Sequence, residues 1–157
     1  MHRPILALVF ALQACAPAQP AEGESLDPFT LQLLRVTKET PSFGGFHSEA
    51  GALVVFIFDE AQRGPAAASL TAIFGDTAPA LNTRPARGQS SESVKNGAAD
   101  VLSVPGTSSF DFDETTGFLR VGVWKASALE PVQTKLLELS VPLESVVLEI
   151  QRPWRAL

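Results

Sequence analysis

The sequence predicts an α+β fold in which two ββαβ repeats share one core and follow an N-terminal helix. Three observations predict it: a helix start at Asp27-Pro28, an apolar pattern that occurs twice, and a composition typical of a globular domain. The chain has 157 residues, of which 45% are hydrophobic and 18% charged, so it can form one domain with a real core. We expect that single α+β domain to span residues 26–157.

The N-terminal helix is predicted to begin at Pro28. The Asp27 side chain can accept hydrogen bonds from free N–H groups at the helix start, and proline fits the first helical position. Pro41 disfavours helical backbone in the residue before it, so the helix should end just ahead of this proline. Apolar residues recur between these limits at helical spacing, and the expected buried stripe consists of Phe29, Leu33, Leu34 and Val36.

The repeated pattern has an offset of 66 residues, which takes Gly51 to Gly117. Self-similarity at one spacing indicates two copies of a structural unit, expected at about residues 42–82 and 107–151. Residues 83–100 are rich in Arg, Gly, Ser and Asn and are predicted to be a mobile surface loop between the units. The offset aligns seven pairs without a gap: the two glycines, Phe46 with Phe112, Leu53 with Leu119, Val55 with Val121, Ile57 with Val123, Pro65 with Pro131, and Leu70 with Leu136.

Each unit is predicted to begin with a β-hairpin. A first strand ends at Phe46 or Phe112, and a polar turn closes on Gly51 or Gly117, where glycine allows a positive φ. The second strand of the first unit, at about residues 53–58, is apolar on both faces, so it should be central and covered twice. The matching residues 119–123 alternate, which predicts that one face of that strand meets solvent.

A helix and a final strand are predicted to complete each unit. In the second unit, Ser127 and Glu130 have the spacing of a capping box, and residues 146–150 read as the final strand. In the first unit, residues 59–62 imitate the same box, but the expected final strand near residues 80–82 is weak. An Arg-Pro dipeptide follows the final strand in both units, at Arg84 and at Arg152.

The N-terminus has the pattern of an export signal. Arg3 precedes an apolar run from Ile5 to Ala14 that is far too short to cross a bilayer as a helix. The segment Leu12-Gln13-Ala14-Cys15 resembles the lipobox of bacterial lipoproteins. That resemblance implies that residues 1–14 are removed as a signal peptide and that Cys15, the only cysteine, is lipidated.

Residues 15–25 are then expected to be a lipidated tether. They are rich in Ala, Pro and acidic residues and lack periodicity, and ten extended residues reach at most about 35 Å. The expected location is the bacterial cell envelope, at the periplasmic face of the outer membrane or the cell surface. Two alternatives stay open: ordinary signal peptidase could release a secreted protein beginning at Gln19, or the segment could be a buried helix with an incidental cysteine.

The charge balance narrows the class of partner. The formal net charge is -5, which argues against nucleic acid, because nucleic-acid binders need basic patches. A single cysteine permits no internal disulfide, so stability must come from packing. No motif predicts a cofactor or a metal site.

Candidate catalytic residues are few. His47 is the only histidine outside the signal segment, and we expect it to be a solvated residue in the first hairpin turn. Asp111 and Asp113 should point to one face of a strand, yet the surrounding segment departs from a calcium loop. Asp59 and Glu60 could act as an acid–base pair, but helix capping explains them better.

Two further segments suggest local roles. Gly44 and Gly45 precede a strand rather than a helix, so they should permit a bulge or close backbone packing instead of forming a phosphate loop. The C-terminal Arg152, Trp154 and Arg155 combine residue types that commonly anchor interfaces, and we take them as candidate partner-binding residues.

The second hairpin carries a family resemblance. Its sequence Asp113-Glu114-Thr115-Thr116-Gly117-Phe118-Leu119-Arg120-Val121-Gly122-Val123 resembles the pro-regions of secreted alpha-lytic-type, chymotrypsin-like bacterial proteases. The likeness covers roughly residues 42–82 and 107–151. In that family the pro-region binds its protease, assists its folding and inhibits it through a C-terminal tail. The family's catalytic residues have no matching positions here.

The expected function is therefore that of a non-enzymatic protein-binding module, held at the envelope by Cys15 and possessing a pro-region-like or inhibitor-like activity toward an extracellular protein. The alternative is a secreted enzyme or a metal-dependent binder of small ligands. It would use His47, Asp111 and Asp113.

Overall fold

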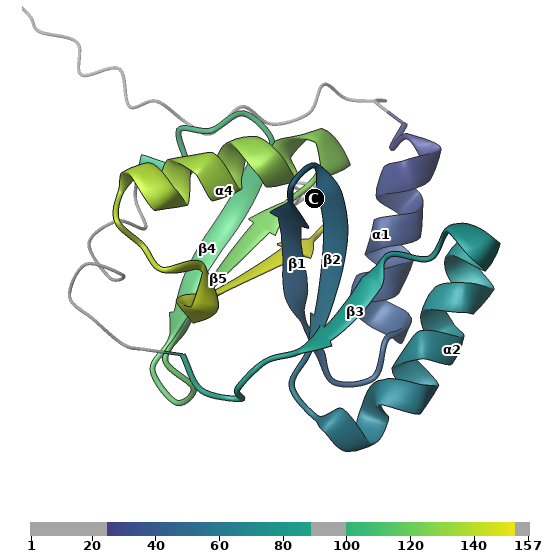
Figure 1. Ribbon diagram of the computed structural model, residues 1–157. Helices are drawn as coiled ribbons and strands as arrows, with labels where there is room; N and C mark the ends of the chain where they lie inside the picture. Colours follow the sequence, from purple (N-terminus) through teal and green to yellow (C-terminus); the bar gives the residue numbers. More distant parts are fainter. Residues whose placement is uncertain (1–24, 89–99, 153–157) are drawn as a thin grey trace, which may run out of the picture.

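The computed structural model describes residues 25–88 and 100–152, which form two three-stranded sheets and three long helices (Figure 1). Helix α1 (Pro28–Glu39) comes first. The first unit then contains β1 (Phe43–Glu49), β2 (Ala52–Ile57), α2 (Arg63–Phe74) and β3 (Ala80–Thr83). The second contains β4 (Thr107–Asp113), β5 (Phe118–Val123), α4 (Leu129–Glu138) and β6 (Val146–Ile150). The predicted α+β fold with two ββαβ repeats is confirmed.

The two sheets have the same topology. In each, the first two strands are antiparallel and the third lies parallel to the second, in the orders β1-β2-β3 and β4-β5-β6. Each hairpin also contains an irregularity in pairing at the same place, between Phe43 and Gly45 in β1 and between Thr107 and Ser109 in β4. A bulge shared by both hairpins is a feature of the unit rather than a local accident.

The single offset of 66 residues is wrong for the outer strands. Val55 pairs with Phe46, whereas the equivalent Val121 pairs with Phe110, so Phe110 and not Phe112 occupies the position of Phe46. The reason is turn length, because the second hairpin turn is longer than the first. The weak final strand of the first unit does exist, as β3.

Helix α1 begins and ends as its sequence predicts. The Asp27 carboxylate accepts a hydrogen bond from the Thr30 backbone N–H at 2.9 Å, and Thr40 forms the C-cap. Leu33, Leu34 and Val36 are buried, but Phe29 is 46% exposed, with its ring 6.3 Å from that of Phe74 in α2, so its place in the buried stripe was wrong.

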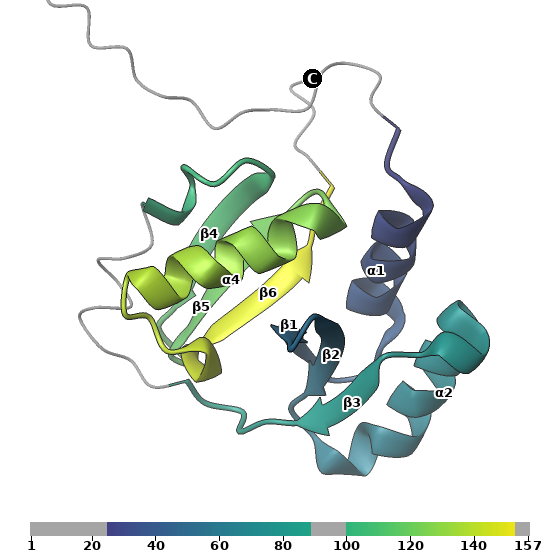
Figure 2. The same ribbon diagram turned by 45° about the horizontal axis from the view of Figure 1, so that its top comes forward.

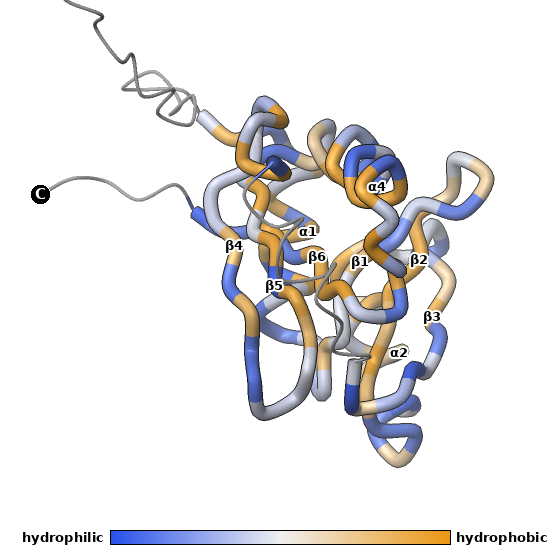
Figure 3. The backbone as a smooth tube through the Cα atoms, turned by 90° about the vertical axis from the view of Figure 1, so that its left-hand side faces the viewer, coloured by the Kyte–Doolittle hydropathy of each residue, from blue (hydrophilic) through white to orange (hydrophobic). Residues whose placement is uncertain are grey.

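Both units contribute to one core, as predicted. Its buried side chains come from α1, from β1 and β2, from α2, and from β5, α4 and β6. The central strands β2 and β5 are more hydrophobic than β4, most of whose residues are polar (Figure 3). The core members include Leu33, Phe46, Val55, Leu70, Leu119, Val121, Val132, Leu136 and Leu148.

Strand β5 is buried on both faces, contrary to the prediction that one face meets solvent. Gln151 lies so close to Gly122 that a Cβ on this glycine would be 2.4 Å from the Gln151 Oε1 atom. Arg120 is only partly exposed and pairs with Glu149 of β6 at 3.6 Å. The β5 face that carries Arg120 is therefore covered by Glu149 and Gln151 rather than exposed to solvent.

The capping box predicted for α4 does not form. The helix begins at Leu129 after a short 3-10 turn over Ala126–Ala128, and its N-cap Ala128 has no side-chain hydrogen bond. In the first unit, Asp59 does cap a 3-10 turn by accepting from the Ala61 N–H at 2.9 Å. The additional turn satisfies backbone groups that a capping side chain would otherwise bind.

The two sheets meet where β1 lies against β6 (Figure 2). Gly45 has a φ of 113°, and a Cβ there would lie 3.2 Å from both the Leu148 nitrogen and the Val147 Cα. The Gly44-Gly45 pair thus provides both the bulge and the close backbone approach that its sequence predicts. We call this contact between β1 and β6 the seam.

None of the helices in residues 25–88 and 100–152 is both long enough and apolar enough to cross a membrane.

Candidate functional site

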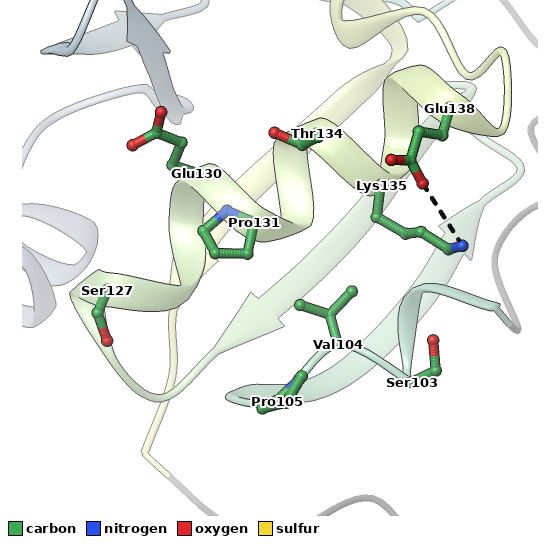
Figure 4. Close-up of a pocket in the computed structure, with 9 residues that line it drawn as sticks. All are labelled: Ser103, Val104, Pro105, Ser127, Glu130, Pro131, Thr134, Lys135 and Glu138. Atoms are coloured by element: carbon green, nitrogen blue, oxygen red, sulfur yellow. Dashed lines mark ion pairs between the residues drawn. The ribbon is translucent and has the colours of Figure 1, made fainter.

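An open groove runs along one side of α4 (Figure 4). It has a volume of about 590 Å³ and is bounded by the helix on one side and by residues 103–105 on the other. Val104 and Pro105 on one wall and Pro131 of α4 on the other supply its apolar side chains (Figure 4). Polar side chains form its rim: Ser103, Ser127, Glu130, Thr134, Lys135 and Glu138.

The wall opposite α4 is fixed by short-range hydrogen bonds. The Ser103 hydroxyl donates to the Asp100 carbonyl at 2.6 Å, and the Thr107 N–H donates to the Val104 carbonyl at 3.1 Å. Gly106 then passes against the turn before α4, where a Cβ would lie 2.6 Å from the Ala128 Cβ. The absence of a side chain at Gly106 is what brings the wall close to the helix.

The groove has an acidic character. The Lys135 ammonium lies 3.7 Å from the Glu138 carboxylate, so these charges largely cancel (Figure 4). Glu130 has no ion pair within the described residues, which leaves one uncompensated negative charge at the opposite end. An open, mixed apolar and polar groove suits an extended chain, because small-molecule sites normally enclose most of the ligand.

His47 is not the solvated turn residue that the sequence suggests. It lies inside β1 and is 8% exposed, with its ring 4.8 Å from that of Phe56. Burial and the neighbouring Arg84 cation lower the pKa of His47 to about 4. The turn is shorter than predicted, because β1 continues to Glu49.

The alternative site built on His47, Asp111 and Asp113 is not assembled. The two aspartates are in β4, and β5 and β6 separate that strand from β1. The Asp113 carboxylate accepts from the Thr115 and Thr116 N–H groups, and hydrogen bonds from Thr116 lower its pKa. Asp113 therefore stabilises the hairpin turn. Among the described residues, no group of three or more His, Cys, Asp or Glu is placed to hold a metal ion.

Asp59 and Glu60 also have structural partners. Asp59 caps the turn described above, while Glu60 forms a two-pronged ion pair with Arg63, whose Nε lies 2.5 Å from Oε1. Glu60 also contacts the Thr83 hydroxyl, and the hydrogen bonds from Arg63 and Thr83 lower the pKa of Glu60 to about 2. This network ties the start of α2 to β3.

Arg84 is the buried residue that sequence reasoning missed. It belongs to a segment expected to be a mobile loop, yet it is only 6% exposed. The one signal was the Arg-Pro dipeptide after each final strand. That signal is ambiguous, because Arg152 of the second dipeptide is exposed and the residue that takes the place of Arg84 after β6 is Gln151.

Other predicted site residues cannot be placed. Arg152 is at the end of the described chain, and Cys15, Trp154 and Arg155 lie outside the described residues, as does most of the predicted loop.

Sequence comparison adds no relative. Neither the protein-family models nor the curated proteins gave a match to this chain.

Proposed function

We propose that this chain is a non-enzymatic protein-binding module, anchored to the bacterial envelope through a lipid on Cys15, whose α4 groove receives an extended segment of another protein. The observation that carries the proposal is the groove itself, which is open to solvent and combines a proline on each wall with hydroxyl and carboxylate groups at its rim (Figure 4). Such a surface can bind a peptide through apolar packing combined with hydrogen bonds.

Charge complementarity supports a basic partner segment. Glu130 is the uncompensated charge of the groove, and a lysine or arginine of the partner would pair with it. An extracellular protein is the partner class that the export signal implies, and a protease is the one that the pro-region resemblance suggests. Arg152, Trp154 and Arg155 remain candidate contacts of the same partner.

The test is peptide binding to the full chain, measured by fluorescence anisotropy with short extended peptides of opposite net charge. We expect basic peptides to bind and Glu130→Lys to weaken them by about tenfold or more, as loss of one charge pair implies. Glu114→Lys is the matched control, since it makes the same charge change in the β4–β5 turn. Equal weakening by both variants, or equal binding of acidic peptides, would overturn the groove as the site.

A further inference from the structure

Arg84 joins the two repeats across the seam. Its Nη1 donates to the Gly44 carbonyl of the first unit at 3.0 Å and to the Val146 carbonyl of the second at 2.8 Å. Its Nη2 donates to the carbonyls of Leu143 and Glu144 at 3.0 and 2.6 Å. Four carbonyls, rather than a carboxylate, thus hold a buried cation.

The guanidinium also lies between one aromatic ring of each unit. Its central carbon is 5.4 Å from the ring centre of Phe56 in β2 and 5.0 Å from that of Phe118 in β5. Both contacts are favourable for a cation at a desolvated position. The position of Arg84 therefore depends on both repeats being docked against each other.

His47 shares these surroundings. Its ring contacts that of Phe56 in a tilted arrangement, and the carbonyls of Val146 and Leu143, which bind Arg84, also act on the imidazole. Within the described residues, its Nε2 is buried without a hydrogen-bond partner. A proton on His47 would therefore put a second cation beside the first, in competition for the same carbonyl oxygens.

The charged groups acting on His47 are Arg84 and Glu144. Burial and Arg84 oppose protonation, while Glu144 and the two carbonyls favour it more weakly. No other charged group among the described residues acts on His47: β2 presents Phe56, β6 supplies the Val146 carbonyl, and α4 presents the neutral Gln133, which binds the main chain of Ser48. Helix α1 and Phe46 both contribute to the hydrophobic core, and Phe46 points to the opposite face of β1 from His47.

We infer that Arg84 and His47 form an acid-sensitive latch, in which protonation of His47 loosens the seam between the two repeats. The latch is a conformational device independent of the proposed peptide groove. Above the ordinary histidine pKa the imidazole is neutral and the seam is closed. As the pH falls toward 4, the population of the open state rises relative to the closed state, because the solvated His47 of the open state binds a proton more readily than the buried His47.

The experiment is amide hydrogen exchange on the full chain across this pH range, corrected for intrinsic rates. The reporter is the Ser48 amide of β1, which donates to Gln133 of the second unit and so reports docking between the repeats, and the reference is the Trp124 amide, which donates to Gly106 within the second unit. With a His47 pKa of 6.5 in the open state and about 4 in the closed state, opening at Ser48 should rise about 80-fold between pH 6.5 and pH 4. The Trp124 amide should change much less.

Two variants test the cause. His47→Gln removes the titrating group, so its Ser48 protection should stay nearly constant over the same range. Arg84→Met removes the opposing cation, so the pKa of His47, followed by proton NMR in a His2→Gln background, should rise toward 6.5. The latch is wrong if His47→Gln loses Ser48 protection as steeply as the wild type. It is also wrong if His47 of the otherwise unaltered chain titrates near 6.5, a measurement that holds even where Arg84→Met fails to fold.

Discussion

Gln133 of α4 holds the main chain of Ser48 in β1 with both ends of its side-chain amide. Its Oε1 accepts from the Ser48 N–H at 2.8 Å, and its Nε2 donates to the Ser48 carbonyl at 2.7 Å. The side chain thereby pairs with β1 as a neighbouring strand would, and it connects the helix of the second unit to the sheet of the first.

We expect Gln133→Ala to destabilise the protein by about 1–3 kcal/mol, because two part-buried backbone groups lose their partners. Gln133→Glu should cost a similar amount, since a carboxylate can still accept from Ser48 but cannot donate to it. Urea unfolding measures both. Thr134→Ala, one position along the helix, is the control and should have little effect. An unchanged unfolding midpoint in Gln133→Ala would show that water replaces the amide without cost.

Arg84→Met should be among the most destabilising single changes, at roughly 3 kcal/mol or more, because several buried carbonyls are left unsatisfied. Arg152→Met provides a control: this residue begins the Arg-Pro dipeptide of the second unit, lies one position further from its final strand than Arg84 does, and is exposed. Its effect should be within about 0.5 kcal/mol of zero. Comparable losses in the two variants would contradict the difference that we draw between them. Thermal and urea unfolding provide the measurement.

Gly45→Ala should destabilise the seam by about 1–3 kcal/mol, because alanine is strained at a positive φ and its methyl group would press on the β6 backbone. Gly64→Ala is predicted to act in the opposite direction. A Cβ at Gly64, in the first turn of α2, would have nothing within 4 Å, so the change should stabilise by up to about 1 kcal/mol. The same sign for both substitutions in calorimetry would refute the packing argument.

The anchoring proposal predicts that the expressed protein incorporates labelled palmitate and fractionates with membranes. Cys15→Ser should abolish both properties, since no other cysteine can take the lipid. Mass spectrometry of the mature protein provides a second readout. An unmodified N-terminus at Gln19 would exclude the lipid anchor and favour the secreted alternative, without affecting the groove.

Local patterns were sufficient where a segment's own neighbours in sequence decide its structure. Asp27 and Pro28 start α1 because capping requires only the next turn of chain. The apolar residues of β2 predict a central strand, and Gly51 and Gly117 have φ values of 79° and 75°, as their turns require. The repeat was recognisable from its apolar positions. The difference in turn length was not recognisable, because an alignment at one offset without a gap assumes that both hairpin turns have the same length.

The sequence by itself therefore determined the start of α1, the central strand β2 and the existence of two similar units. Only the tertiary structure decided which polar residues are buried. His47 and Arg84 look like surface residues in their own segments, and they are buried because the second unit supplies carbonyls of residues 143–146 and the ring of Phe118. Strand β5 is likewise covered by Glu149 and Gln151. Periodicity shows which residues share a face, but segments distant in sequence determine what covers that face.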